Sequence, residues 1–200
     1  MTTLDANYWN ARWEAGQTGW DIGQASPPLT AYAASIPTTE RGAMRVLIPG
    51  CGNAYEALEL LRMGYGELTL LDIAPEALAH ARARLETEET ACADRIRWIC
   101  ADFFAHTDTY DLILEQTFFC AIDPSLRARY ARKMYDLLRP GGRLAGVLFD
   151  RQFEGGPPFG GSMAEYRALF EALFEIETLI PCPNSIPPRR GTEAFFVLRR

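Results

Sequence analysis

RVLIPGCGN, residues 45–53, is the stretch that sets the expected fold of this 200-residue chain. Residues 45–49 form a short apolar run typical of a buried strand, and Gly50 and Gly52 then allow a tight turn. Apolar residues recur at helical spacing over 54–61, and Gly64 ends the pattern. A strand, a glycine turn and a helix in this order are typical of the first unit of a doubly wound α/β sheet.

The same alternation of strand and helix continues toward the C-terminus. Further strands are predicted at 67–72, 96–101, 110–115, 143–149, 175–180 and 193–198. Helices are predicted from Pro75, from Asp123 to the stop signal at 137–142, and from the capping box of Ser162 and Glu165. Only a loop separates the last two strands, so these two are expected to be antiparallel.

The predicted fold is therefore an α/β, Rossmann-like sheet of seven mostly parallel strands, with an antiparallel last strand and helices on both faces. Residues 1–200 are expected to form a single domain. Residues 1–43 are rich in Trp and Pro and lie outside the alternating pattern. We expect them to form an N-terminal cap with short helices.

An acidic residue stands twenty positions after the glycine turn. Asp72 ends the second predicted strand, and Gly52 precedes it by twenty residues. In a doubly wound sheet, ligands bind beyond the carboxyl ends of the strands, and an acidic residue at this distance can accept hydrogen bonds from ribose hydroxyls. The spacing indicates a nucleoside-type cofactor, whereas a tight turn without a ligand is the competing interpretation.

The dinucleotide pattern G-x-G-x-x-G is incomplete in this chain. Tyr55 stands where the third glycine would be, and its bulk at the start of the helix leaves little room for a pyrophosphate. S-adenosylmethionine (SAM) carries a ribose and an adenine but no phosphate, so it does not need that room. The pattern therefore favours SAM over the alternative, the nicotinamide dinucleotide of an oxidoreductase.

Asp102 and Phe103 follow the third predicted strand. An Asp at this strand end can accept a hydrogen bond from an adenine amino group, and an aromatic ring can flank the base. Taken alone, the two residues would be interpreted as a solvated Asp and a core Phe. Their position, at a strand end in line with Gly50 and Asp72, favours contact with adenine.

The composition argues against several classes of protein. Twenty basic and 26 acidic residues give a net charge of −6, whereas nucleic-acid binding normally needs a basic excess. Five cysteines without a CxxC pair, Cys92 among them, and only two histidines argue against a disulfide framework and a zinc site. The chain shows no signal peptide and no run long enough to cross a bilayer. We therefore expect a cytoplasmic monomer that binds a small molecule and no metal or membrane.

Nine short stretches together form a recognisable pattern. They are WNARW (9–13), TGWDIG (18–23), PGCG (49–52), LDI (71–73), DFF (102–104), TFFCAI (117–122), LRPGG (138–142), GGPPF (155–159) and SIP (185–187). With these stretches the chain resembles the thiopurine S-methyltransferase family of class I SAM-dependent methyltransferases. Within that family, it is most similar to the small bacterial members and to the plant thiol and halide methyltransferases.

The resemblance implies roles for individual residues. The cofactor would be contacted by Trp9, Trp13 and Trp20 from the cap, Gly50 and Gly52 at its methionine end, Asp72 and Ile73 at the ribose, Asp102 and Phe103 at the adenine, and Gln116 near the substrate. The substrate would be contacted by Trp20, Phe119 and Phe159. The plant branch often has Tyr at the positions of Gln116 and Phe159, so this chain lacks two hydroxyls there. For Trp9 taken alone, packing on one face of its helix is the favoured interpretation.

The activity that the resemblance implies is transfer of a methyl group from SAM to a small soft nucleophile, leaving S-adenosylhomocysteine. Thiols, bisulfide, halides and thiocyanate are such nucleophiles. None requires a strong general base, because a thiol of pKa ~8.5 is already partly ionised at neutral pH and a halide carries no proton. We assign no catalytic residue, and Cys120, in an apolar run, is not expected to be a nucleophile. A non-catalytic SAM-binding protein of the same fold is the alternative.

Overall fold

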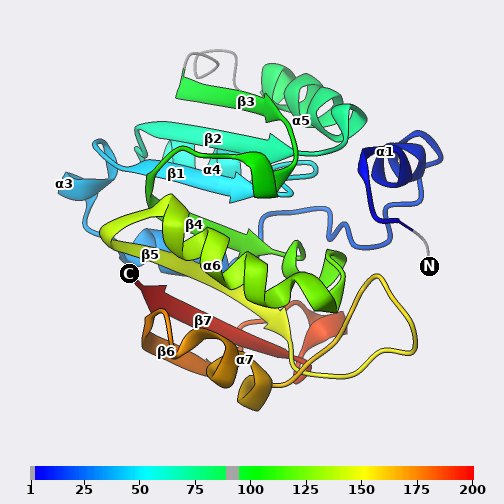
Figure 1. Ribbon diagram of the computed structural model, residues 1–200. Coiled ribbons are helices and arrows are strands. Elements are labelled where there is room, and N and C mark those ends of the chain that lie inside the picture. The colour runs from blue at the N-terminus through cyan, green and yellow to red at the C-terminus, as the bar shows by residue number, and fades with distance from the viewer. Residues whose placement is uncertain (1–2, 89–94) are drawn as a thin grey trace.

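A computed structural model describes residues 3–88 and 95–200 of the chain, and Cys92 lies outside these ranges. Within them, seven strands form one sheet in the order β3-β2-β1-β4-β5-β7-β6 (Figure 1). The neighbours from β3 to β5 pair in parallel, and β7 is antiparallel to both β5 and β6. The predicted mostly parallel sheet with an antiparallel last strand is confirmed.

The elements alternate along the chain much as the sequence predicts. The strands are β1 (Arg45–Pro49), β2 (Glu67–Asp72), β3 (Ile96–Cys100), β4 (Tyr110–Gln116), β5 (Leu138–Phe149), β6 (Glu175–Pro181) and β7 (Glu193–Arg199). The α-helices are α1 (Ala6–Glu14), α2 (Pro27–Ser35), α3 (Thr38–Arg41), α4 (Tyr55–Arg62), α5 (Pro75–Glu88), α6 (Arg127–Leu137) and α7 (Met163–Phe170). Short 3₁₀ helices are η2 (Phe103–Ala105), η3 (Phe119–Ala121), η4 (Pro124–Leu126) and η5 (Pro187–Arg189).

Two boundaries differ from the prediction by more than one residue. The helix predicted from Asp123 begins as the 3₁₀ helix η4, where the Asp123 carboxylate accepts the amide of Ser125 at 2.9 Å, and α6 follows it. β5 begins at Leu138 and not at 143, because Leu138 already pairs with Tyr110 ahead of a shift in the β4–β5 register. The helix therefore passes into the strand without an intervening loop.

Alternate side chains of β1 face opposite layers of helices. Val46 and Ile48, at most 4% exposed, join a core cluster with residues of α2, α4 and α5. Leu47, fully buried, joins a second cluster with residues of α6 and α7. Figure 1 shows α6 and α7 in front of the sheet and α4 behind it. The predicted helices on both faces are confirmed, and burial on both sides explains why β1 is a continuous apolar run.

The N-terminal segment folds as short helices and is held to the sheet by polar contacts. The side-chain oxygen of Asn10, on α1, accepts the amide of Glu76 in the first turn of α5 at 2.9 Å. The buried carboxylate of Glu56, on α4, accepts the amide of Ser26 at 2.9 Å. Each contact satisfies a buried or terminal backbone donor, so the segment is fixed relative to the two helices that follow β1 and β2.

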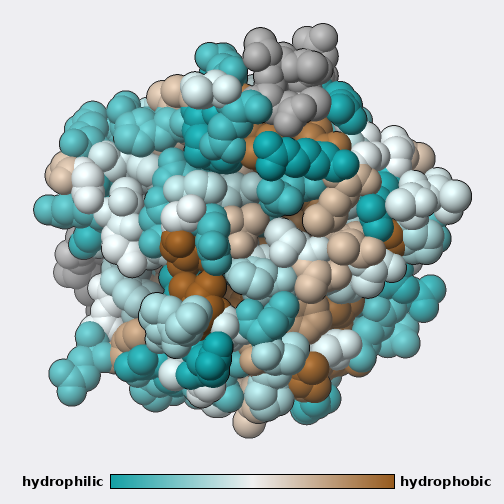
Figure 2. All heavy atoms as spheres, turned by 180° about the vertical axis from the view of Figure 1, so that it is seen from behind, coloured by the Kyte–Doolittle hydropathy of each residue, from teal (hydrophilic) through white to brown (hydrophobic). Residues whose placement is uncertain are grey.

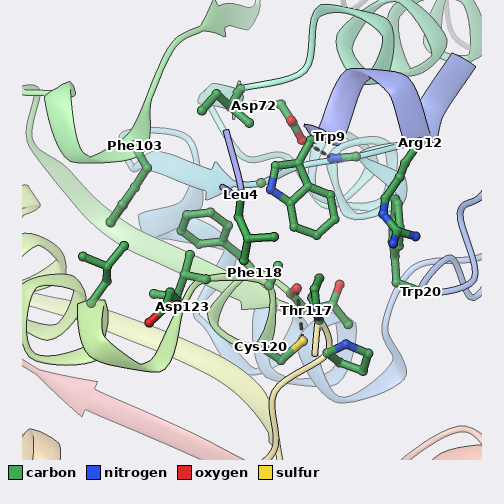
Figure 3. Close-up of a pocket in the computed structure, with 18 of the residues that line it drawn as sticks. Leu4, Trp9, Arg12, Trp20, Asp72, Phe103, Thr117, Phe118, Cys120 and Asp123 are labelled. Atoms are coloured by element: carbon green, nitrogen blue, oxygen red, sulfur yellow. Dashed lines mark hydrogen bonds between the residues drawn. The ribbon is translucent and has the colours of Figure 1, made fainter. Parts of the chain in front are cut away.

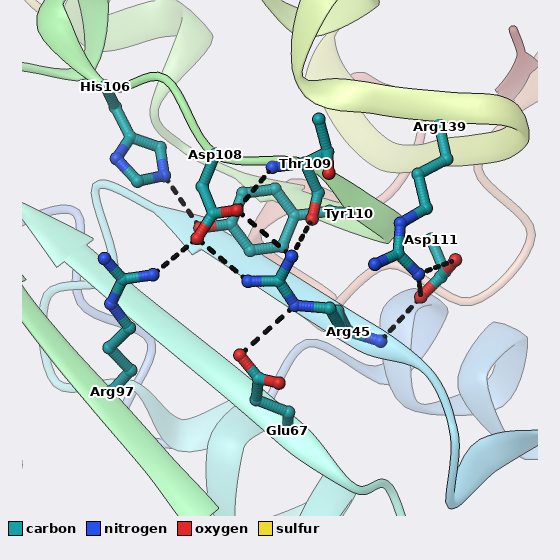
Figure 4. A network of polar contacts seen from close by, with 9 residues as sticks. All are labelled: Arg45, Glu67, Arg97, His106, Asp108, Thr109, Tyr110, Asp111 and Arg139. Carbon is teal, nitrogen blue, oxygen red and sulfur yellow. Dashed lines mark hydrogen bonds and ion pairs between the residues drawn. The ribbon is translucent and has the colours of Figure 1, made fainter.

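A network of charged residues joins the amino ends of five strands, β1 to β5 (Figure 4). The guanidinium of Arg45, at the start of β1, donates to both oxygens of Asp108, at 3.0 and 2.8 Å, and Arg97 of β3 also binds Asp108. Asp111 of β4 accepts the Arg45 amide at 2.8 Å and pairs with Arg139 at 3.0 Å. These contacts tie together the strand ends opposite the carboxyl ends of the sheet.

The surface behind the sheet carries no broad hydrophobic face. Figure 2 shows hydrophobic residues on this side in small areas separated by hydrophilic ones. Of the large hydrophobic side chains in the described ranges, only Ile180 is exposed, at 45%. None of the helices in these ranges combines the length and the apolar character that a bilayer span requires.

Candidate active site

A pocket of about 950 Å³ lies beyond the carboxyl ends of the strands. This volume is near the upper end of the ~300–1,000 Å³ usual for small-molecule sites. The strand order sets the order of the residues along the pocket wall. From β3 to β5 they are Asp102 and Phe103, then Asp72 and Ile73, then Gly50 and Gly52, then Thr117, Phe118 and Cys120, and finally Phe149 and Arg151. Trp9, Trp13 and Trp20 line it from the cap.

The glycine turn brings backbone close to this pocket. Gly50 has φ +58°, and a Cβ atom there would stand 2.5 Å from the Phe118 ring. The position therefore requires glycine both for its conformation and for space. Cys51 donates its amide to the carbonyl of Leu71 at 3.1 Å, which ties the turn to the end of β2.

Asp72 lies directly beneath this turn and is 7% exposed. One carboxylate oxygen accepts the amide of Gly52 at 3.0 Å, and the other accepts the amide of Ala74 at 2.9 Å. Burial raises the pKa of Asp72, and the surrounding amides oppose the shift. Since each carboxylate oxygen has two lone pairs, the carboxylate keeps acceptor capacity toward the pocket. The twenty-residue spacing thus places an acidic group where a ribose hydroxyl can donate to it.

Three tryptophans of the cap gather over the pocket. The Trp20 ring centroid lies 5.5 Å from that of Trp9 and 6.0 Å from that of Trp13, in edge-to-face arrangements. Trp13 is 6% exposed, and its ring would lie 3.4 Å from a Cβ atom at Gly52. Figure 3 shows Trp9 and Trp20 on the side of the pocket that faces α1. The three tryptophans of the cap and the glycine turn therefore line one pocket.

The cap is joined to the glycine turn by Asp21. Its carboxylate accepts hydrogen bonds from the Asn53 side chain at 2.6 Å and from the Tyr55 hydroxyl at 3.3 Å. Tyr55, which stands where the dinucleotide pattern has its third glycine, thus binds the cap. This contact gives Tyr55 a structural reason to stand where a pyrophosphate site would have glycine.

Asp102 and Phe103 form the end of the pocket at β3. Asp102 is exposed and caps η2 by accepting the amide of Phe104 at 2.9 Å. Phe103 is 3% exposed, and its ring packs edge-to-face on Phe118 with centroids 5.0 Å apart. Both residues line the pocket, where the carboxylate can accept a hydrogen bond from a ligand.

Three residues predicted for the site do not line the pocket: Gln116, Phe119 and Phe159. Phe119 is 1% exposed and packs on Tyr130 in the core, with ring centroids 5.0 Å apart. Phe159 packs its ring where a Cβ atom of Gly156 would stand, and its amide donates to the carbonyl of Cys120 at 2.7 Å. Gln116 ends β4, and its side-chain oxygen is buried without a hydrogen-bond partner.

The cause of the difference at β4 is a turn organised by Glu115. This fully buried carboxylate accepts the amides of Phe118 and Phe119, both at 2.9 Å, and the hydroxyl of Tyr130 at 2.7 Å. Thr117 takes φ +58° at the same turn. The backbone bends there and continues as η3, and Phe118, not Phe119, lines the pocket (Figure 3).

Further lining residues were not singled out by the sequence. They include Arg12 on α1, Thr117, Phe118 and Ile122 after β4, Arg129 on α6, Phe149, Arg151 and Phe153 after β5, Pro157 and Pro158, and Arg189 on η5. The motifs TFFCAI and GGPPF marked two of these segments without showing which side chains face inward. For the arginines, the sequence carries no distinguishing signal.

Cys120 lines the pocket but is held as a neutral thiol. Burial raises its pKa to about 12, and its Sγ donates to the carbonyl of Thr117 at 3.3 Å. A thiol of this pKa carries almost no thiolate at neutral pH, which supports the expectation that Cys120 is not a nucleophile. Across the described ranges, no three His, Cys, Asp or Glu residues form a group that could hold a metal ion.

Comparisons with known proteins agree with this geometry. The model of the thiopurine S-methyltransferase family matches residues 4–194. A probable thiol methyltransferase 2 of Arabidopsis thaliana is 32% identical over 96% of this chain and 84% of its own length. Thiocyanate methyltransferase 1 of the same plant is 30% identical over 96% of this chain and 83% of its own length.

A solved structure supports the fold. The 1,6-didemethyltoxoflavin-N1-methyltransferase of Burkholderia thailandensis, crystallised with S-adenosylhomocysteine, matches with a TM-score of 0.70 at 19% identity, over 98% of this chain and 86% of that one. At this identity the match shows a shared Rossmann-like methyltransferase fold. With the family match over nearly the whole chain, these findings identify the chain as a SAM-dependent methyltransferase that belongs to the thiopurine S-methyltransferase family.

Proposed function

We propose that this enzyme methylates a small soft nucleophile, namely a thiol, bisulfide, thiocyanate or halide. Two of its relatives are named for a thiol and for thiocyanate. The observation that carries the proposal is the composition of the pocket wall beyond β4 and β5. That wall combines the apolar side chains Phe118, Ile122, Phe149, Phe153, Pro157 and Pro158 with the cations Arg151 and Arg189.

The wall between β3 and β1 suits SAM as the cofactor. We propose that Asp72 binds the ribose, Asp102 and Phe103 the adenine, and the turn at Gly50 and Gly52 the methionine end. The positive φ of Gly50 and the free acceptor capacity of Asp72 support this assignment. When bound, SAM supplies a methyl group made electrophilic by its sulfonium.

We assign the tryptophans of the cap to contact with the positively charged sulfonium of the cofactor. An indole ring can stabilise a cation at its face by roughly 0.5–2 kcal/mol. Trp13 and Trp20 line the pocket on the side of the glycine turn, so their rings can contribute this term. The same rings exclude water from that side of the pocket.

The pocket wall beyond β4 and β5, where we place the methyl acceptor, suits a nucleophile that is already an anion. Apolar side chains remove water from such an anion, which raises its reactivity toward a cationic methyl donor. Arg189 is only 13% exposed in its side chain and lies 3.5 Å from Glu193, so it adds positive charge that this carboxylate partly offsets. Within the described ranges, no histidine lines the pocket, which agrees with a substrate that needs no general base.

The test is turnover with a panel of acceptors. Purified enzyme and SAM are mixed with benzenethiol, hydrosulfide, thiocyanate, iodide and, as an oxygen analogue, phenol. Liquid chromatography measures S-adenosylhomocysteine, and headspace gas chromatography measures the methylated products. We expect products from sulfur or halide acceptors and none from phenol. The proposal fails if no sulfur or halide acceptor gives S-adenosylhomocysteine above the acceptor-free rate.

The open pocket bears on the alternative of a non-catalytic SAM-binding protein. That alternative would be favoured by a filled acceptor side, whereas the pocket measures about 950 Å³ and extends to Arg189. We also propose that the chain acts as a single-domain monomer in the cytoplasm. Sedimentation equilibrium and cell fractionation would test these last two assignments.

A further inference from the structure

We propose that Arg12 binds the carboxylate at the amino-acid end of the cofactor. This inference rests on the proposed assignment of the pocket wall to SAM. It adds a charged residue that neither the glycine turn nor the tryptophan pattern indicates.

The direction of the cofactor follows from the order of the strands. Asp102, beyond β3, and Asp72, beyond β2, provide acceptors for the adenine and the ribose. The next strand along is β1, so the amino-acid end of the cofactor lies at the turn of Gly50 and Gly52. A zwitterionic amino acid at this point needs a cation for its carboxylate.

Arg12 is on the element that covers this turn. It belongs to α1, next to Trp13, whose ring would lie 3.4 Å from a Cβ atom at Gly52. Arg12 itself lines the pocket, and Figure 3 shows its side chain beside Trp20. The guanidinium is therefore on the wall that faces the methionine end.

The donors of Arg12 are incompletely used. Its Nε is buried without a hydrogen-bond partner. The guanidinium packs over the Tyr8 ring at 4.8 Å, and no ion pair joins it to a carboxylate of the described ranges. A buried donor without a partner costs free energy, and a guanidinium presents the planar fork of donors that matches a carboxylate. The terminal Nη donors are not buried and make no hydrogen bond within the described ranges, so a ligand carboxylate in the pocket can bind them.

The other arginines of the described pocket wall are engaged elsewhere. Arg129 packs over Phe104 at 4.4 Å, on the side of the adenine. Arg151 packs over Phe153 at 4.6 Å, on the side of the acceptor. Arg189 is bound to the carbonyl of Trp20 and lies near a carboxylate. Arg12 alone among these four lies on α1, over the glycine turn.

The experiment compares two ligands that differ at the amino-acid end. S-adenosylhomocysteine carries the carboxylate, whereas 5′-methylthioadenosine shares the nucleoside and the thioether but has no amino acid. Calorimetry gives both dissociation constants for the wild type and for Arg12→Gln. Hydrogen bonds to a charged group typically contribute ~1.5–3 kcal/mol, so S-adenosylhomocysteine should bind roughly 10–100-fold more weakly to the variant. Methylthioadenosine has no carboxylate for Arg12 to bind, so its dissociation constant should change by less than about twofold.

Two additions sharpen the test. Arg12→Lys keeps the charge and should recover part of the lost affinity. Decarboxylated S-adenosylhomocysteine keeps the ammonium, and its affinity should not respond to Arg12→Gln. Arg129→Gln is the matched control, because it removes a pocket arginine at the adenine side and should preserve the ratio of the two dissociation constants.

The outcomes separate this inference from the proposed function. Equal losses for S-adenosylhomocysteine and methylthioadenosine would show a structural role for Arg12 and overturn the inference, as would an unchanged affinity for S-adenosylhomocysteine. A wild-type protein that binds neither ligand would instead overturn the assignment of the pocket to SAM.

Discussion

The guanidinium of Arg189 donates a hydrogen bond to the carbonyl oxygen of Trp20, although the two residues stand 169 positions apart in the chain. The donor–acceptor distance is 2.9 Å, and the same guanidinium packs over the Phe149 ring at 5.2 Å. Arg189 belongs to η5, just before β7. A residue near the C-terminus therefore holds the N-terminal cap over the carboxyl ends of the strands.

Replacing Arg189 should loosen this cap. Arg189→Ala removes a hydrogen bond from a charged donor, a contribution of ~1.5–3 kcal/mol in typical cases. We expect faster cleavage of residues 1–43 in limited proteolysis and weaker binding of S-adenosylhomocysteine, by about tenfold or more. Arg190→Ala is the matched control, since the neighbouring Arg190 is exposed. Identical cleavage rates in the two variants would show that the contact does not hold the cap.

The bounds of the central strands could be predicted closely, because burial on both faces constrains the residue types within each strand. β1 and β2 have the predicted bounds of 45–49 and 67–72, since a strand buried on both faces is a mostly apolar run. The start of β5 could not be predicted, because it depends on the pairing of Leu138 with Tyr110 across the sheet. Such pairing between distant segments is not visible in the hydrophobic periodicity of either segment.

In the candidate site too, some residues could be predicted from the sequence and others could not. Asp72 could be predicted from a spacing of twenty residues, which the strand–turn–helix geometry fixes locally. The choice between Phe118 and Phe119 could not, because both follow Thr117 in an apolar run. It is decided at the bend where the buried carboxylate of Glu115 accepts the amides of both residues.

Gly50→Ala should damage both stability and cofactor binding. An alanine at φ +58° costs ~1–2 kcal/mol. Its Cβ would stand 2.5 Å from the Phe118 ring, so the ring must move along the pocket wall. We expect urea denaturation to show a loss larger than the conformational cost, and calorimetry to show S-adenosylhomocysteine binding at least tenfold more weakly.

Gly16→Ala separates the conformational cost of a positive φ from the effect of the contact with Phe118. Gly16 has φ +64°, and a Cβ atom there would meet no atom within 4 Å. This variant should lose ~1–2 kcal/mol of stability through conformation alone and keep wild-type cofactor affinity. If Gly50→Ala binds the cofactor as well as Gly16→Ala does, the contact with Phe118 has no part in shaping the site.

Asp72→Ala should weaken cofactor binding by ~1.5–3 kcal/mol, the usual contribution of hydrogen bonds to a charged group. The substitution also leaves the amides of Gly52 and Ala74 without their acceptor. A thermal unfolding measurement on the unliganded variant reports that second effect separately. Asp72→Asn, which keeps one acceptor oxygen, should lose less stability than Asp72→Ala. Unchanged affinity for S-adenosylhomocysteine in both variants would contradict the ribose assignment.

Glu115 should make the stability of the protein fall as pH rises through the range from about 4.5 to 7. Burial raises the pKa of this carboxyl from 4.5 to about 7 in the folded state. Between these values the native state binds more protons than the unfolded state, so the free energy of unfolding contributed by Glu115 is full below 4.5 and lost as pH approaches 7. At about 1.4 kcal/mol per pKa unit, the contribution amounts to roughly 3 kcal/mol.

Glu115→Gln tests this dependence while keeping an acceptor oxygen for the amides of Phe118 and Phe119. Urea denaturation at pH 5 and at pH 8 gives the free energy of unfolding for the wild type and the variant. Relative to the wild type, the variant should be more stable at pH 8 than at pH 5, because it no longer carries a charge that is unfavourable when buried. Glu171→Gln, at an exposed position after α7, should retain the wild-type pH dependence. An unchanged difference between the two pH values in Glu115→Gln would show that Glu115 does not titrate in this range.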